Sequence, residues 1–350
     1  HPLPFDTLTP ALFTRLLESQ IEQTQREISA LLRVEDCSYG TLLEPLDRIL
    51  TRVSETFDIG QHLESIVGGA DWRVSMAGLR PAITALLTSI PLNQPLYEQL
   101  VRLNELRSEL TASQRRHLDI TLESFKLKGA CLNELHKTQL RRIELDLSKA
   151  TANFAQNVID ATETIAIEVS TMDLVGLPEN IRTQAIERGR NAGKQCAILS
   201  GDSVCVINVL RFASSRQIRE QVWQSFYTRA NSDPFDNRIL IEDILNLRKE
   251  KASLLGFENI IELRLKTRMI ADEAAADAFL EGLVRASSDE AAMEQNSLNE
   301  FARAHELISQ DEEIEPWDIN FLAERQRQDT CDFKDVLLAP YTTLPLLLNG

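Results

Sequence analysis

Apolar residues recur at three- and four-residue intervals over most of the chain, which is the spacing of a helix with one buried face. The first such stripe follows Thr9-Pro10, where Thr can cap a helix and Pro fits its first turn. The pattern therefore predicts a helix beginning at about residue 10 and ending near residue 31. Similar stripes predict further helices at about 42–57, 76–90, 96–110, 177–193, 214–226, 241–256, 272–284 and 289–308.

The longest stripe runs from Leu140 to Ala161 and predicts a helix of roughly 25 residues. Basic residues on this helix, among them Lys137 and Arg141, first suggest a nucleic-acid patch. They alternate with acidic residues, which is typical of a solvated helix face. We therefore interpret the charges as surface charges.

Two segments favour β structure. Residues 165–169 alternate apolar and polar side chains, as a short strand does. Residues 196–212 contain two β-branched runs around Ser200-Gly201-Asp202, which predicts a β hairpin. The expected fold is thus mainly α, a multi-helix protein with one small β hairpin. We divide it into an N-terminal helical region, residues 1–162, and a second helical region, residues 163–350, that holds the hairpin at 196–212.

The pattern weakens after Pro316, and we read the following residues as a polar loop. Trp317 is expected to anchor this loop against the core, because a large aromatic side chain in a polar segment is usually buried.

Composition agrees with a helical protein, because Gly and Pro, 13 and 12 of the 350 residues, are scarce. The net charge of −16 is spread over both halves, and it disfavours binding to nucleic acid or to anionic membranes. No apolar run approaches the roughly 18 residues that span a bilayer. We expect no nucleic-acid partner, no membrane association and no signal peptide. The missing initiator Met suggests a trimmed or tagged chain.

The cysteines number five, and none forms a C-x-x-C pair, which disfavours a disulfide framework or a zinc ribbon. A reducing, cytoplasmic location is the simplest interpretation. The cysteines are Cys37, Cys131, Cys196, Cys205 and Cys331.

Catalytic motifs are hard to find. The sequence has no G-x-S-x-G, no phosphate-binding glycine loop and no G-x-G-x-x-G. A helical zinc site needs two histidines four residues apart, but His62, His117 and His136 are widely separated. His305-Glu306-Leu307-Ile308-Ser309 begins like H-E-x-x-H and ends in Ser, which cannot replace the second imidazole. We therefore predict no catalytic residue and no metal ligand in the chain, and its substrate-binding residues stay unknown.

Several segments together resemble the zinc oligopeptidases of the thimet oligopeptidase and oligopeptidase A type. The similarity runs in order along the chain from Leu3 to Gly350. The segments that carry it are Leu3-Pro4-Phe5, QHLES with His62, NFAQNVIDAT (153–162), Leu177-Pro178-Glu179, RQIREQVWQSFYTRA (216–230), ILNLRKEKASLLGFEN (244–259), Lys266-Thr267-Arg268-Met269, Glu315-Pro316-Trp317-Asp318-Ile319 and Pro340-Tyr341.

The resemblance implies that the catalytic zinc domain is absent from this chain. The family carries its chemistry on a later H-E-F-G-H helix and a downstream Glu, where zinc and the first Glu of the motif activate water. No family residue of this kind can be carried onto a position here. The resemblance therefore implies the N-terminal, channel-forming portion of a cytosolic metallopeptidase that hydrolyses short peptides, with zinc in the full-length parent and none in this chain. Alone, the chain is expected to be inactive.

Two other hypotheses stay open at this point. One is a stand-alone, non-catalytic homologue that acts as a peptide-binding or adaptor protein. The other is a helical scaffold unrelated to peptidases, which a fold without a hairpin at 196–212 beside a long helix over 133–160 would favour.

The fragment hypothesis also predicts exposed apolar surface that a missing half would cover, and self-association through that surface. The leucines expected in this patch are Leu337, Leu338, Leu344 and Leu346 to Leu348.

Overall fold

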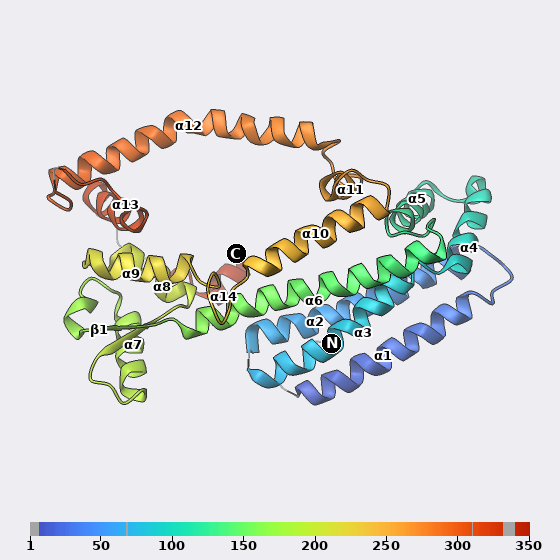
Figure 1. The fold of residues 1–350 in the computed structure, drawn as a ribbon, viewed down its shortest axis with the longest axis horizontal. Helices are drawn as coiled ribbons and strands as arrows, with labels where there is room; N and C mark the ends of the chain where they lie inside the picture. Colours follow the sequence, from blue (N-terminus) through green and yellow to red (C-terminus); the bar gives the residue numbers. More distant parts are fainter. Residues whose placement is uncertain (1–6, 68, 310, 332–339) are drawn as a thin grey trace. The chain divides into compact units, whose positions relative to one another are not determined.

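The computed structural model of the chain describes residues 7–67, 69–309, 311–331 and 340–350, and helices make up most of these ranges (Figure 1). The mainly α fold is confirmed, with one two-stranded antiparallel sheet in the described part of the chain. The chain divides into two compact units, each made of two segments. Unit 1 is His1–Phe154 with Ile239–Glu273, and unit 2 is Ala155–Arg238 with Ala274–Gly350.

This division differs from the expected one, residues 1–162 and 163–350, because residues 239–273 return to unit 1. The return is stabilised by ion pairs between α10 (Arg238–Leu254) and α6 (Glu134–Thr164). Arg142 Nη2 lies 2.7 Å from Glu250 Oε1, and Lys251 Nζ lies 2.6 Å from Glu144 Oε1.

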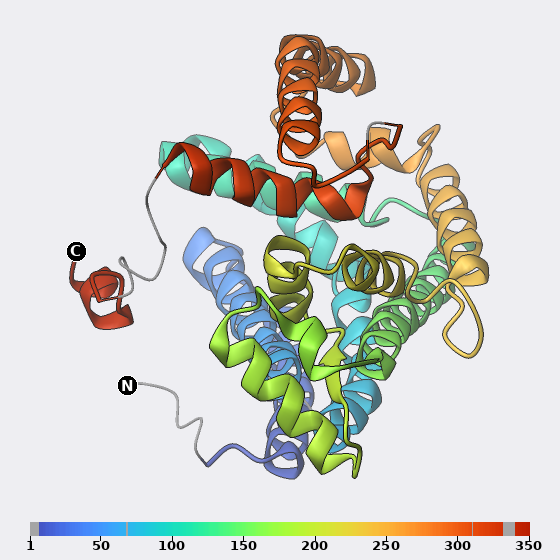
Figure 2. The same ribbon diagram turned by 90° about the vertical axis from the view of Figure 1, so that its left-hand side faces the viewer.

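Unit 1 is built on helices that pack through leucine-rich faces. Thr9 caps the first helix as predicted, because its hydroxyl accepts a hydrogen bond from the Leu12 amide. Helices α1, α2 and α3 lie side by side in both ribbon views (Figures 1 and 2). The helices of this unit are α1 (Pro10–Leu31), α2 (Glu44–Val67), α3 (Ala70–Ser89), α4 (Gln94–Glu105), α5 (Ala112–Leu127), the first two thirds of α6, α10 and α11 (Ile260–Leu265), with short turns η1 (Tyr39–Leu43) and η2 (Arg107–Glu109).

One charge on α6 departs from the solvated face that we expected. Lys137 is almost fully buried, and its ammonium donates to Gln94 Oε1 at 3.0 Å and lies 3.3 Å from Glu134 Oε1. The pair with Glu134 offsets part of the desolvation cost of this buried cation. Arg142 and Lys149 of the same helix are exposed, as expected.

Unit 2 combines the small sheet with short helices. Its core includes Ile167 and Val169 of β1, Leu199 of β2, and the buried face of α8. The elements are β1 (Ala166–Val169), η3 (Thr171–Leu174), α7 (Glu179–Asn191), β2 (Ala197–Ser200), α8 (Ser203–Phe212), α9 (Arg216–Tyr227), α12 (Glu273–Ala304), α13 (Pro316–Thr330) and α14 (Leu344–Asn349).

The hairpin predicted over 196–212 is wrong. Strand β2 pairs with β1, with Ala166 opposite Ser200 and Val169 opposite Ala197. The second β-branched run forms α8, because Asp202 caps it by accepting from the Cys205 amide at 2.9 Å. Its buried positions, Cys205, Val206, Val209 and Leu210, follow helical spacing, which outweighs the β propensity of valine and isoleucine.

The two helices predicted over 272–284 and 289–308 form one continuous helix, α12 (Figure 1). The serines between them do not cap a new helix. Ser287 and Ser288 donate instead to the carbonyls of Leu283 and Val284, at 3.0 and 2.6 Å, so the helical backbone continues.

The face of α12 that we expected to be buried is exposed. Phe279, Leu280, Leu283 and Val284 retain more than half of their accessible surface, at 59%, 57%, 53% and 63%. Amphipathic spacing therefore marks an apolar face here that no described residue covers.

The polar loop expected after Pro316 is a helix. Pro316 begins α13, and the Asp318 carboxylate accepts a hydrogen bond from the Glu315 amide at 3.1 Å in the first turn. Trp317 packs against the core of unit 2, so its role as an anchor is confirmed. Of the predicted leucine patch, Leu337 and Leu338 lie outside the described residues, whereas Leu344 and Leu346 to Leu348 are exposed as expected.

Candidate functional site

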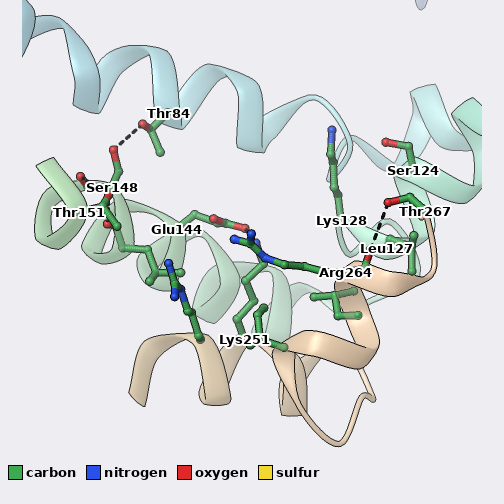
Figure 3. A pocket seen from close by; sticks show the side chains of 14 residues that line it. Thr84, Ser124, Leu127, Lys128, Glu144, Ser148, Thr151, Lys251, Arg264 and Thr267 are labelled. Atoms are coloured by element: carbon green, nitrogen blue, oxygen red, sulfur yellow. Dashed lines mark hydrogen bonds and ion pairs between the residues drawn. The ribbon is translucent and has the colours of Figure 1, made fainter. Parts of the chain in front are cut away.

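A cavity of about 500 Å³ opens in unit 1 between helices α3, α5, α6, α10 and α11 (Figure 3). Four leucine and isoleucine side chains and five hydroxyls line it together with charged groups. The hydroxyls are those of Thr84, Ser124, Ser148, Thr151 and Thr267. A volume of this size lies within the range of small-molecule sites in proteins, roughly 300–1,000 Å³.

The charges of this cavity oppose those of the chain as a whole. Four cations, Lys128, Arg248, Lys251 and Arg264, line it with the single carboxylate of Glu144. The cavity therefore carries a net positive charge in a chain of formal charge −16. A concave site of one sign concentrates ligands of the other sign.

Glu144 and Lys251 form the fixed part of the site. Their side chains meet across α6 and α10, and both are about three-quarters buried. Figure 3 shows the Arg264 side chain extending toward the same point from the segment after α10. Burial lowers the pKa of Lys128, the nearby charge of Lys251 lowers it further, and Glu144 opposes the shift.

Substrate-binding residues could not be assigned from the sequence, and these cations were not among the residues that it singled out. The resemblance to the oligopeptidases could have pointed to some of the lining residues. Arg248 and Lys251 lie in the family-like segment 244–259, and Thr267 lies in the family-like segment 266–269. The structure brings the two segments together at the cavity with residues of α5 and α6. Sequence spacing alone could not indicate this meeting, because it depends on the return of residues 239–273 to unit 1.

A second pair of family-like segments meets in unit 2. Arg216 and Arg219 of α9 both bind Asp318 at the start of α13, with Nη2 to carboxylate oxygen distances of 2.8 Å in each case. Trp223 of α9 and Trp317 pack edge to face, with ring centroids 5.7 Å apart. This cluster joins two helices about 100 residues apart, and its buried position indicates a structural role.

Hydrogen bonds set the protonation of this cluster. Burial raises the pKa of Asp318, but hydrogen bonds from Arg216, Arg219 and the Glu315 amide outweigh it, and the net pKa is lowered. Glu324 behaves similarly. Burial opposes the hydrogen bonds from Arg327, Arg211 and Gln328, which lower its pKa to about 2. Both carboxylates are therefore ionised partners of arginine and are not poised as general acids.

The histidines considered as metal ligands lie apart. His62 is exposed on α2. His117 Nδ1 lies 3.1 Å from Tyr39 Oη, and its Nε2 lies 3.6 Å from Asp47 Oδ1. His136 lies half-buried near the start of α6, and Asn133 Oδ1 accepts from its amide at 2.9 Å.

His305 follows the end of α12 at Ala304, and Glu306 has a φ of 54°. His305 and Ser309 therefore do not share a helix face. Ser309 donates to Glu312 Oε2 at 2.8 Å instead.

The donor set does not fit a zinc ion. Within the described ranges, no three His, Cys, Asp or Glu side chains converge as a metal site. We therefore assign no step of metal-assisted hydrolysis to these residues.

The five cysteines are free. Burial raises the pKa of the Cys37, Cys196 and Cys205 thiols, which disfavours the nucleophilic thiolate. None of the helices in the described residues has the length and apolar character to cross a membrane.

Comparison with known proteins agrees with the segments already described. A model of the neurolysin and thimet oligopeptidase N-terminal domain matches residues 15–137, and a model of peptidase family M3 matches residues 209–350. The chain belongs to this family of peptidases, that of thimet oligopeptidase and oligopeptidase A. These matches reject the hypothesis of a helical scaffold unrelated to peptidases. The missing hairpin at 196–212, taken alone, would have favoured that hypothesis.

Individual relatives cover nearly the whole chain. It is 26% identical to a probable cytosolic oligopeptidase A of Arabidopsis thaliana, over 99% of this chain and 51% of that protein. It is 25% identical to oligopeptidase A of Haemophilus influenzae, over 99% of this chain and 52% of that protein. It is also 24% identical to a dipeptidyl carboxypeptidase of Escherichia coli, over 99% of this chain and 51% of that protein. The chain spans about half the length of the curated relatives it matches.

Proposed function

We propose that this chain forms the N-terminal helical wall of a peptide channel in a zinc-dependent oligopeptidase that hydrolyses short peptides. The observation that carries the proposal is the pair of family matches, which lie on either side of residues 138–208 and reach into both units. The catalytic zinc would be bound by residues other than those described here. Among the described residues, no His, Cys, Asp or Glu side chains are grouped so that they could hold it.

A second part of the proposal concerns the chain by itself. The 350 residues contain no H-E-x-x-H, and the nearest segment, residues 305–309, is not helical. We infer that the isolated chain binds no stoichiometric zinc and cleaves no peptide. Its contribution would be to shape and select the peptide.

The cytoplasmic location also belongs to the proposal. It rests on the number and spacing of the cysteines. One Arabidopsis relative is named cytosolic, and another is named an organellar oligopeptidase A, so the names of relatives do not decide it. No observation favours the stand-alone adaptor hypothesis.

The test compares two proteins with one set of internally quenched peptides of five to twelve residues. The 350-residue chain with one equivalent of zinc is expected to give no turnover. A protein from a reading frame that continues to an H-E-x-x-H segment is expected to cleave the peptides and to lose activity with a chelator. Chelator-sensitive turnover by the 350-residue chain would overturn the proposal, as would a stop codon directly after Gly350 together with an inactive chain.

A further inference from the structure

Three of the cations that line the cavity of unit 1 lie outside the ion pairs of the described residues, although the Glu144 charge acts on one of them, Lys128. Within the described part of the chain, the side chains of Lys128, Arg248 and Arg264 form no ion pair and no hydrogen bond to another side chain. The fourth cation, Lys251, is paired with Glu144. The cavity thus holds more positive charge than its own carboxylate can balance.

Anionic partners are plentiful elsewhere in the same unit. The chain has 53 acidic and 37 basic residues, and nearby cations such as Arg142 find partners. Arg248 lies only two residues from Glu250, but Glu250 binds Arg142 and not Arg248. The charges at the cavity are therefore left free in a protein that could have neutralised them.

The rest of the lining favours an organic anion. Guanidinium groups bind carboxylates through two parallel hydrogen bonds, which makes arginine the preferred partner for that group. Leu127, Leu147 and Leu263 provide apolar contacts for a short carbon chain, and the hydroxyls of Ser124 and Thr267 can donate further hydrogen bonds. The side chain of glutamate has both a carboxylate and a short carbon chain.

We propose that this cavity binds the carboxylates of a short acidic peptide, with Arg248 and Arg264 as the groups that receive them and Lys128 as a further positive charge at the site. The Glu144–Lys251 pair holds α10, which carries Arg248, against α6 at the cavity. The choice of a peptide as the source of the carboxylate rests on the function proposed above. The binding of a carboxylate as such does not depend on that function.

The experiment is isothermal titration of the full 350-residue chain at pH 7 and low salt. The probes are the acetylated tripeptide Ac-Ala-Glu-Glu, its neutral analogue Ac-Ala-Gln-Gln-amide, glutarate and inorganic phosphate. The acidic tripeptide is expected to bind and the neutral analogue is not. R248Q and R264Q are each expected to weaken binding by about tenfold or more, because each removes a charge-assisted hydrogen bond.

Matched controls lie beside each arginine. Lys249 neighbours Arg248 on α10, and Arg268 lies four residues after Arg264, in the turn that follows α11, but neither lines the cavity. K249Q and R268Q remove the same charge, and they are expected to leave the dissociation constant within about twofold. Circular dichroism of all four variants checks that the helices are retained.

The outcomes separate the two proposals. Unchanged affinity in folded R248Q and R264Q, or equal binding of the neutral analogue, would overturn the carboxylate site. Binding of phosphate without the acidic tripeptide would overturn the choice of carboxylate, and binding of glutarate without the tripeptide would overturn the peptide as its source. Arginine-dependent binding of the tripeptide supports the inference, even if the peptidase assay above fails.

Discussion

The Arg219 guanidinium lies 2.8 Å from the Asp318 carboxylate, and the two side chains expose only 4% and 1% of their surface. Arg219 also donates to the Ala213 carbonyl at 2.9 Å and stacks on the Phe321 ring at 4.0 Å. The pair fastens α13 to α9 and to the end of α8. Because both charges are withdrawn from water, each depends on the other for compensation.

We predict that Asp318→Asn destabilises unit 2 by about 3–5 kcal/mol, because it leaves a buried guanidinium without its anion. Urea unfolding followed by circular dichroism and tryptophan fluorescence measures the change, since Trp223 and Trp317 lie beside the pair. Asp311→Asn is the control, since Asp311 is an exposed acid in the segment before α13. Equal stability of the two variants would contradict the structural role of the pair.

The lowered pKa of Glu324 predicts acid sensitivity. Its carboxylate has a folded pKa of about 2 and an ordinary value of 4.5, so the unfolded state binds protons first as the pH falls. The stabilisation is fully present above about pH 5 and is lost as the pH falls toward 2. For this buried group it amounts to about 3 kcal/mol.

The measurement is the free energy of unfolding at several pH values between 6 and 2. Glu324→Gln is expected to be less stable at pH 6 and to show a shallower loss toward acid. Glu290→Gln, at an exposed position of α12, is expected to follow the parent chain. Parallel curves for Glu324→Gln and the parent would refute the role assigned to this carboxylate.

Two helical glycines are predicted to respond in opposite directions to alanine. A Cβ at Gly189 of α7 would lie 1.9 Å from the Cys196 carbonyl oxygen, so the contact between α7 and the segment entering β2 must open. Gly189→Ala should cost roughly 1–3 kcal/mol or more. At Gly282 of α12 nothing lies within 4 Å of the added Cβ, so alanine should stabilise the helix by roughly 0.5–1 kcal/mol. Thermal melts of both variants test the contrast, which the opposite order of stabilities would contradict.

The uncovered face of α12 is predicted to promote self-association, because clustered exposed apolar side chains favour contact with another surface. Sedimentation velocity over a range of concentrations should detect oligomers of the 350-residue chain. The double variant Phe279→Gln with Leu283→Gln should shift the distribution toward monomer. Met293→Gln alters an exposed apolar residue of the same helix outside this cluster, and it should have little effect. A chain that stays monomeric at all concentrations would count against this use of the face.

Local sequence signals predicted most helices well, since caps and apolar spacing act within a few residues. Thr9 before α1 and the stripe of α6 are examples. The errors arose where a distant contact decided the outcome. Residues 203–212 have the composition of a strand, but β2 finds its partner in β1 and leaves the following residues to form α8.

The candidate site was less accessible to sequence analysis. Arg248 and Arg264 are ordinary surface cations by their spacing, and nothing in the sequence distinguishes them from Lys249 or Arg268. Their shared cavity exists because α10 and α11 pack beside α5 and α6 after an excursion of about 80 residues through unit 2.

The sequence by itself determined the helical class, the approximate positions of most helices and the likeness to oligopeptidases, because propensity, capping and collinear segments are properties of neighbouring residues. Only the tertiary structure decided which charges are paired and which are free. Glu144 pairs with Lys251 and Asp318 pairs with Arg219, whereas Arg248 and Arg264 at the cavity form no ion pair with the described residues. The physical reason is that electrostatic compensation depends on distance in space and burial, and neither follows from the order of residues along the chain.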